Sequence, residues 1–174
     1  SSKAFETWKD VAPSVREKMM IKAAALMEER AKELQDVLID EAGSTLLKAG
    51  YETHHTPNYL RSMAGECRRI KGETYLSDYP GVKSYAIRRP LGPVLAIAPF
   101  NFPLLLGIRK IGFALAAGNT VILKPSEMTP VIGLKLGELF RDAGFPPGVL
   151  NVVPAVGADL GDGLITDKRV RFVT

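Results

Sequence analysis

The sequence predicts an α/β protein in which a helical segment is followed by an open parallel sheet with helices on both faces. Two observations lead to this class. Residues 1–89 carry apolar side chains mostly at helical spacing, and from residue 90 onward short apolar runs alternate with helical segments. Strands that alternate with helices of about 10–15 residues indicate βαβ units, whose strands are parallel and whose crossovers are right-handed. We therefore expect a helical lead-in with a strand pair over residues 1–89, packed on a second domain over residues 90–174.

The lead-in is expected to contain two long helices. The spacing of apolar side chains predicts a helix over 14–42 with a break near Glu29. A second helix is predicted over 44–69, and Pro57 should kink or break it because proline lacks a backbone donor and clashes with the preceding turn. Two extended runs around a proline-glycine turn then predict a strand pair over 72–89.

From residue 90 the expected elements follow a Rossmann-like order. Thr129 and Pro130 are residue types preferred at the start of a helix, and Gly118 and Gly144 follow predicted helix ends, where left-handed backbone is common. The predicted strands are 93–98, 120–124, 149–153 and 169–174, and the predicted helices between them are 103–117, 130–143 and 158–165.

Composition and charge argue against several classes of partner. The 174 residues carry a net charge of +4 with no basic stripe, which argues against a nucleic-acid partner. Residues 91–108 carry no charge and are just long enough to span a bilayer, but three prolines would break a membrane-spanning helix there. A single cysteine excludes an internal disulfide and fits a reducing compartment. Because the chain also begins with polar and charged residues, we expect a cytoplasmic protein with no membrane partner.

Three unusual segments follow the predicted strands. In open parallel sheets, ligands bind beyond the carboxyl ends of the strands, and those ends meet at one edge. The segments read "IAPFNFP" after the first strand, "KPSE" after the second and "PAVGADLG" after the third. Their convergence predicts a ligand site at this edge.

Lys124 and Glu127 lie three positions apart at the end of an apolar strand, next to the rigid Pro125. Taken alone, the two charges read most simply as a solvated surface pair. At a strand end they can instead bracket the vicinal hydroxyls of a ribose, because a carboxylate accepts two hydroxyl hydrogen bonds and disfavours a 2′-phosphate.

Gly157 and Gly161 are candidates for binding the pyrophosphate of the same ligand. Their spacing around a predicted helix start permits close approach of the backbone to phosphate groups, although a simple tight turn explains them equally well. The common G-x-G-x-x-G fingerprint is absent. Any dinucleotide site here is therefore of another kind.

Asn101 lies in a bend between two phenylalanines that are flanked by prolines. An amide buried in such an apolar bend needs a hydrogen-bond partner. Either Asn101 bonds its own backbone and stabilises the turn, or its N–H is a fixed donor for a developing oxyanion.

Several long segments together resemble the NAD(P)-dependent aldehyde dehydrogenases. They are "PLGPVLAIAPFNFPLLLGIRKIGFALAAGNTVILKPSEMTP", "LFRDAGFPPGVLNVVPAVGADLGDGL" and "VRFVT", in the family's order and spacing. The departure within these motifs is Phe100, where the family pattern has tryptophan. The resemblance implies an incomplete aldehyde dehydrogenase fold and an enzyme that oxidises an aldehyde to a carboxylic acid with NAD, or alternatively with NADP.

The resemblance also implies roles for individual residues. Asn101 would be the catalytic residue that supplies the side-chain half of an oxyanion hole, while Lys124 and Glu127 would hold the adenosine ribose. Gly157 and Gly161 would lie near the adenine and the pyrophosphate. The full set of expected cofactor-binding residues is Ile97, Ala98, Pro99, Phe100, Lys124, Pro125, Ser126, Glu127, Gly157, Gly161 and Phe172.

By the same resemblance, the nucleophile is expected outside this chain. Family members attack a small-molecule aldehyde with a cysteine thiolate, pass through a thiohemiacetal and a thioester, and assemble as homo-dimers or homo-tetramers. Their cysteine, their general-base glutamate and an oligomerising segment come after the position of Thr174, so we expect an internal piece of a longer enzyme that is inactive alone. A CoA-acylating or phosphate-reducing relative, or an inactive nucleotide-binding fragment, remains an alternative.

Cys67 and the adjacent His54 and His55 are the other residues with reactive side chains. Cys67 lies on a predicted helix away from the strand ends, so we expect a partly buried structural thiol, although two neighbouring arginines would lower its pKa. Adjacent histidines cannot both face one ion from a helix, and no carboxylate or cysteine cluster accompanies them. No metal site is expected.

Overall fold

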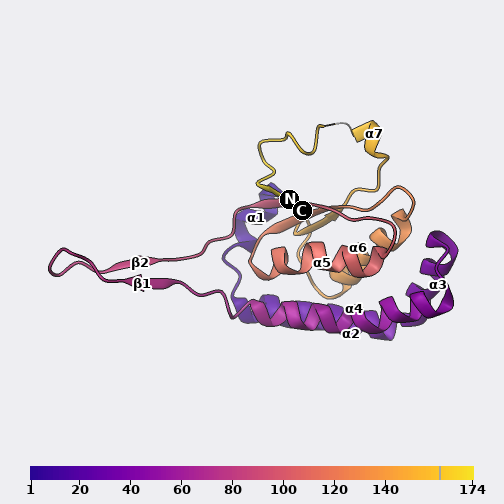
Figure 1. The fold of residues 1–174 in the computed structure, drawn as a ribbon, viewed down its shortest axis with the longest axis horizontal. Coiled ribbons are helices and arrows are strands. Elements are labelled where there is room, and N and C mark those ends of the chain that lie inside the picture. The colour runs from indigo at the N-terminus through magenta and orange to yellow at the C-terminus, as the bar shows by residue number, and fades with distance from the viewer. Residues whose placement is uncertain (161) are drawn as a thin grey trace.

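The chain folds as an α/β protein, as the sequence predicts, with a parallel sheet between helices (Figure 1). The computed structural model describes residues 1–160 and 162–174. Each neighbouring pair of strands in the sheet is parallel. Their order across the sheet is β5 (Leu150–Val152), β4 (Thr120–Lys124), β3 (Pro93–Ile97) and β6 (Phe172–Val173).

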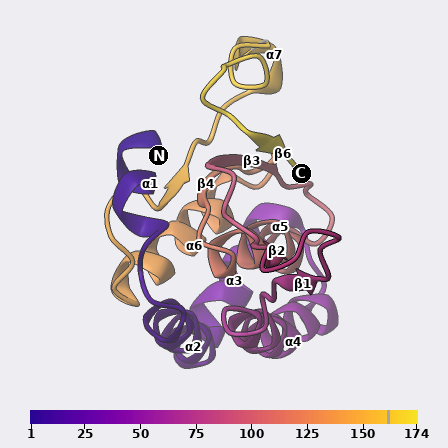
Figure 2. The same ribbon diagram turned by 90° about the vertical axis from the view of Figure 1, so that its left-hand side faces the viewer.

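Helices form two layers on one side of the sheet and lie more sparsely on the other (Figure 2). The inner layer packs directly on the strands, and the outer layer packs on the inner one. The inner layer is α5 (Pro103–Ala116) and α6 (Pro130–Asp142), and the outer layer is α2 (Pro13–Glu29), α3 (Ala31–Ala42) and α4 (Leu46–Glu66). On the opposite side lie α1 (Ser2–Trp8), which contacts β4, and α7 (Gly157–Leu160).

The two central strands direct alternate side chains to opposite faces of the sheet. Val94 and Ala96 of β3, with Val121 and Leu123 of β4, are buried in the core formed with the inner helices. Leu95, Ile97 and Lys124 alternate with these residues and face the α7 side of the sheet, because successive side chains of a strand point to opposite faces. Burial on one face and a partly open second face leave room for a ligand on the α7 side.

Two short strands, β1 (Glu73–Tyr75) and β2 (Ser84–Ala86), form an antiparallel hairpin that projects from the body of the molecule (Figure 1). The hairpin therefore lies within the region for which the sequence predicts a strand pair. Its residues are largely exposed and contribute nothing to the core described above.

The predicted break near Glu29 is confirmed, because α2 ends at Glu29 and α3 begins at Ala31. Of the two effects predicted for Pro57, a kink or a break, the break is wrong. Pro57 is buried inside α4, which is helical on both sides of it. Burial of this face against α2 and α5 outweighs the lost backbone hydrogen bond, because tertiary packing overrides local helix propensity.

The elements at the two ends differ most from the predicted ranges. Of the helix predicted over 158–165, residues 158–160 are helical as part of α7 and residues 162–165 form turns, since glycine-rich sequence favours turns over a continued helix. The strand predicted over 169–174 is reduced to β6, an edge strand that pairs only with β3 among the described residues. Helix α1, which the sequence patterns did not predict, is held by the burial of Trp8 against Phe145, with ring centroids 5.4 Å apart.

Phe140 provides a test of this packing. Its ring is fully buried and lies 4.8 Å from that of Phe145, so Phe140→Ala should lower the free energy of unfolding by about 3–5 kcal/mol. Phe113 on the neighbouring helix is 55% exposed, and Phe113→Ala should change it by less than about 1 kcal/mol. Urea denaturation of both variants measures the two changes, and equal losses would contradict the assignment of the core.

Candidate functional site

The carboxyl ends of β3 and β4 lie side by side. The register pairs Ile97 with Lys124, and the backbone N–H of Ala98 donates to the carbonyl of Lys124 across 3.0 Å. The turn that carries Asn101 follows β3 directly, and the turn that carries Glu127 follows β4. Two of the three unusual segments in the sequence therefore meet at one edge of the sheet.

Lys124 and Glu127 form an ion pair at this edge. The Lys124 side chain is only 12% exposed, and its Nζ donates to the carbonyl of Pro125 at 3.1 Å and to Glu127 Oε2 at 3.3 Å. The Glu127 carboxylate is half exposed. Hydrogen bonding to its own backbone N–H, and then Lys124, hold the pKa of Glu127 below its ordinary value. The site thus presents a fixed ammonium and an ionised carboxylate with free acceptor positions.

Lys124 also lines a cavity of about 280 Å³ on the α7 side of the sheet. The other residues that line it are Leu95, Ile97, Gly157, Leu160, Leu164 and Ile165. A Cβ placed on Gly157 would meet no atom within 4 Å, so the packing of the protein itself does not require glycine there. The cavity offers an apolar surface with one cation at its rim.

The turn after β4 is stiffened by its own contacts. Pro125 is buried and packs on Gly133 of α6, where a Cβ would lie only 2.6 Å from the proline ring. The hydroxyl of Ser126 accepts the backbone N–H of Met128 at 3.2 Å. These contacts hold the turn, so the direction in which it presents Glu127 is set by packing.

The segment after β3 is more open than the sequence suggests. Asn101 is exposed, and so are Pro99 and Phe100, whereas Ala98 is buried. The expectation of a buried Asn101 amide is therefore wrong, because the bend lies at the surface and water can reach it. Within the described part of the chain the Asn101 side chain makes no hydrogen bond.

Three of the expected cofactor-binding residues, Ile97, Lys124 and Gly157, line this cavity. The others that the structure describes do not line it: Ala98, Pro99, Phe100, Pro125, Ser126, Glu127 and Phe172. The register pairs Phe172 with Val94, whose side chain belongs to the core on the α5 face, and Phe172 is half exposed at the sheet edge. Phe172 is therefore placed away from the cavity that Lys124 lines. Gly161 lies outside the described residues.

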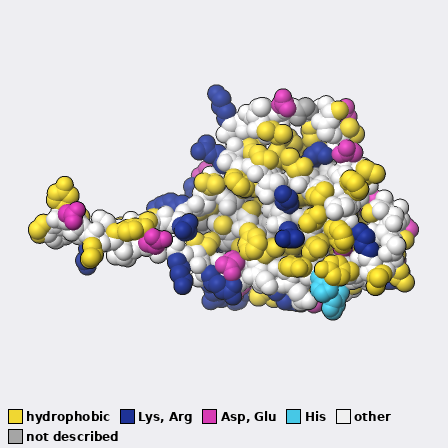
Figure 3. All heavy atoms as spheres, in the orientation of Figure 1, with side chains coloured by type: hydrophobic (Ala, Val, Ile, Leu, Met, Phe, Trp, Pro, Cys, Tyr) yellow, Lys and Arg dark blue, Asp and Glu magenta, His cyan; other side chains and the backbone are white. Residues whose placement is uncertain are grey.

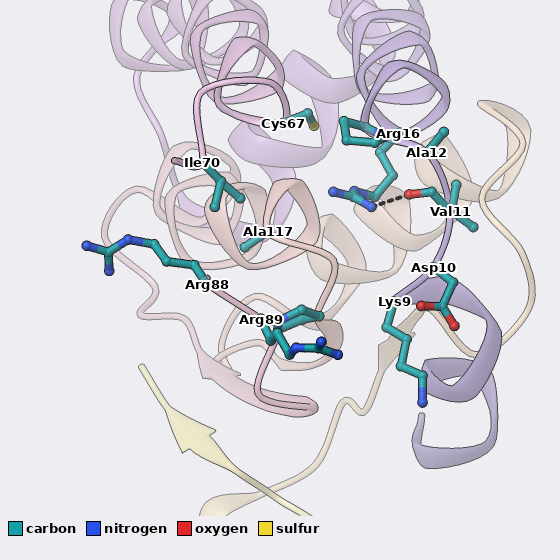
Figure 4. A pocket seen from close by; sticks show the side chains of 12 residues that line it. Lys9, Asp10, Val11, Ala12, Arg16, Cys67, Ile70, Arg88, Arg89 and Ala117 are labelled. Carbon is teal, nitrogen blue, oxygen red and sulfur yellow. Dashed lines mark hydrogen bonds between the residues drawn. The ribbon is translucent and has the colours of Figure 1, made fainter. Parts of the chain in front are cut away.

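A larger cavity, of about 720 Å³, lies at the opposite end of the strands (Figure 4). Its lining includes Pro90 and Ala117, which precede β3 and β4, and also Cys67 and Arg16. The Arg16 guanidinium is buried and donates to the carbonyls of Ala116, at 3.2 Å, and Val11. Arg16 therefore ties the loop after α1 to the end of α5, which is a structural role.

Cys67 is a buried thiol in this second region. It is 2% exposed, its Sγ lies 3.7 Å from the sulfur of Met20, and burial raises its pKa. The neighbouring arginines do not activate it, because Arg68 pairs with Glu17 and Arg69 with Glu66. Cys67 is remote from the carboxyl ends of the strands, where the candidate site lies, and it lacks the exposure of a nucleophile.

The two histidines lie at the surface beside an apolar patch of α4 (Figure 3). Their rings are 4.9 Å apart, and His55 also stacks on Tyr51 at 4.3 Å. Over residues 1–160 and 162–174, no group of three or more His, Cys, Asp or Glu residues could hold a metal ion. None of the described helices has the length and apolar character needed to cross a membrane.

Comparison with known proteins identifies the family. The family model described as "Aldehyde dehydrogenase family" matches residues 1–174. The chain belongs to the aldehyde dehydrogenase family. It is 38% identical to vanillin dehydrogenase of Pseudomonas fluorescens, over 99% of this chain and 36% of that enzyme.

Solved structures give the same result. A salicylaldehyde dehydrogenase from Pseudomonas putida G7, complexed with salicylaldehyde, superposes with a TM-score of 0.95 at 35% identity, over 99% of this chain and 36% of that one. An NAD-dependent benzaldehyde dehydrogenase from Corynebacterium glutamicum gives 0.95 at 35% identity, over 99% and 38%. The neighbours include NADP-dependent as well as NAD-dependent enzymes. The chain spans about a third of the length of these relatives.

Sequence patterns missed two acidic residues beside the candidate site. Glu52 of α4 accepts backbone N–H groups at the start of α5, and Glu41 of α3 does the same at the start of α6. Each contact joins residues at least 50 positions apart, so no local motif could have indicated it.

The burial of Cys67 predicts slow chemical modification. In the native protein at pH 8, iodoacetamide should alkylate Cys67 at least about a hundredfold more slowly than in urea, because a buried thiol with a raised pKa is protonated and inaccessible. Intact-protein mass spectrometry follows the reaction. Equal rates in the two states would show that the thiol is open and reactive.

Proposed function

We propose that this chain supplies the dinucleotide site and the oxyanion donor of an enzyme that oxidises an aldehyde to a carboxylic acid with NAD. In this proposal residues 90–174 belong to the cofactor domain, and residues 1–89 pack on it as a helical support. The observation that carries it is the Lys124–Glu127 pair at the carboxyl ends of two parallel strands, beside an apolar cavity. Ligands of open parallel sheets bind at such strand ends.

The residues at this edge fit a nucleotide. The half-exposed Glu127 carboxylate has oxygens available to accept both hydroxyls of the adenosine ribose, and Lys124 is fixed beside it. The apolar cavity suits a flat base, and Gly157 contributes no side chain to its lining. Residues 97–100, the last residue of β3 and the three that follow it, lie at the same edge. When bound, NAD would accept the hydride that leaves the aldehyde carbon.

Asn101 is proposed as a donor to the substrate oxygen. Its amide is exposed and makes no hydrogen bond within the described part of the chain, so its N–H groups are available. A carbonyl oxygen gains negative charge when a nucleophile attacks the carbon, and an amide N–H placed there stabilises that charge. Such a donor contributes about 3 kcal/mol to lowering the barrier.

The nucleophile of the proposed reaction is a cysteine outside residues 1–174. Cys67, the chain's single cysteine, is buried at the other end of the strands and has a raised pKa. The covalent route through a thiohemiacetal and a thioester therefore requires another thiol. Aromatic aldehydes are the first substrates to assay, because the names of similar enzymes specify salicylaldehyde, vanillin and benzaldehyde.

Glu127 provides the test of cofactor choice. Its carboxylate would repel the extra phosphate of NADP, whereas Lys124 would attract it. Glu127→Ser in the full-length enzyme should raise kcat/KM for NADP relative to NAD by about tenfold or more, which is about 1.4 kcal/mol. The assay measures aldehyde oxidation with each cofactor at one ionic strength.

A matched control lies on α6, where Glu138 pairs with Lys135 at the same spacing, away from the cavity. Glu138→Ser should leave the cofactor ratio unchanged. An unchanged ratio in Glu127→Ser as well would mean that the Glu127 carboxylate does not face the ribose.

A further inference from the structure

Glu52 is a fully buried carboxylate that caps another helix. Its exposed fraction is 0%, and its Oε2 accepts the backbone N–H groups of Leu104 and Leu105, each at 3.1 Å. These are two of the unpaired donors in the first turn of α5. The negative charge of Glu52 also lies at the positive end of the helix dipole.

Glu41 caps α6 in the same way. Its two carboxylate oxygens accept the N–H groups of Val131 and Ile132, the second at 3.0 Å. Neither helix has a local cap, since the N-cap residues Phe102 and Thr129 make no side-chain cap bond. The starts of both inner helices are therefore held by carboxylates of the outer helical layer.

These two helix starts directly follow the two turns of the candidate site. Asn101 lies three residues before Leu104, and Glu127 lies four residues before Val131. The turns have little freedom of their own, because each runs from a strand end fixed by the sheet to a helix start fixed by a carboxylate. A shift of the start of α5 would therefore displace the Asn101 side chain, and a shift of the start of α6 would displace that of Glu127.

Lys48 extends the contact around Glu52 towards Asn101. Its Nζ donates to Glu52 Oε1 at 2.7 Å and to the hydroxyl of Ser44 at 2.9 Å. The same ammonium lies 4.6 Å from the centre of the Phe102 ring, the residue next to Asn101. A buried carboxylate needs such pairing, and an ordinary Ser or Thr cap would satisfy the helix at a smaller desolvation cost.

We propose that Glu52 is a positioning residue for Asn101 and that Glu41 is a positioning residue for the Lys124–Glu127 pair. The proposal rests on the proposed function, in which Asn101 acts on the substrate oxygen and Glu127 binds the ribose. In this proposal the outer helical layer takes part in the reaction indirectly. Each carboxylate holds the helix start that follows one of the two site turns, and so fixes the position of that turn. Glu52 acts on the chemical step, and Glu41 acts on cofactor binding.

A double-mutant cycle in the full-length enzyme tests the first half. Asn101→Ala should lower kcat about a hundredfold, and Glu52→Ala should lower it about tenfold or more with the Kd for NAD changed less than about twofold. In the Asn101→Ala background, Glu52→Ala should cost no more than about a further twofold, because the residue it positions is already gone.

Glu41→Ala is the matched control, since it removes a cap of the same kind from the neighbouring helix. It should raise the Kd for NAD about threefold or more and leave kcat at saturating NAD within about twofold. Circular dichroism and melting temperature confirm that each variant is folded. If Glu52→Ala is not recovered folded, Glu52→Gln, which keeps an acceptor oxygen but not the charge that holds Lys48, enters the same cycle with an expected loss of about threefold.

The outcomes distinguish failure of the positioning role of Glu52 from failure of the proposed function of Asn101. A full additional loss from the Glu52 variant in the Asn101→Ala background would overturn the positioning role, and so would equal effects of the Glu41 and Glu52 variants on kcat and on NAD binding. An unchanged kcat in Asn101→Ala alone would instead overturn the proposed function of Asn101, and the positioning role with it.

Discussion

The parallel pairing of β3 with β4 organises both the core and the candidate site. Its register sets Ile97 beside Lys124, so the turns that follow the two strands begin at the same edge. Alternation along the strands then sends Val121 and Leu123 into the helical core and Lys124 to the opposite face. One set of backbone hydrogen bonds thus determines both the core and the side on which a ligand can bind.

The parts of this arrangement with local causes could be predicted from the sequence. Apolar runs alternating with helical segments indicate parallel strands, and "KPSE" at a strand end indicates a charged pair at the site edge. Burial could not be predicted in the same way. Pro57 is accommodated inside α4 because neighbouring helices bury it, and Asn101 is exposed although its flanking residues are aromatic. The contact between Glu52 and the start of α5 could not be predicted, because it joins two helices that are distant in the sequence.

The two cavities show why size alone does not locate the chemistry. The larger one lies at the amino ends of the strands, where the buried Arg16 guanidinium ties two segments together beside the buried Cys67 thiol. The smaller one lies at the carboxyl ends, where Lys124 and Glu127 leave polar atoms available. Position relative to the sheet, together with an exposed carboxylate beside a fixed ammonium, selects the smaller cavity.

We propose that the strand-end edge with Glu127 binds the adenosine half of NAD. A crystal structure of the full-length enzyme with NAD bound tests it most directly. We expect both ribose hydroxyls within hydrogen-bond distance of the Glu127 carboxylate, and the base in the cavity lined by Leu95 and Ile97. An NAD molecule bound at the Arg16 cavity, or a ribose out of reach of Glu127, would contradict it.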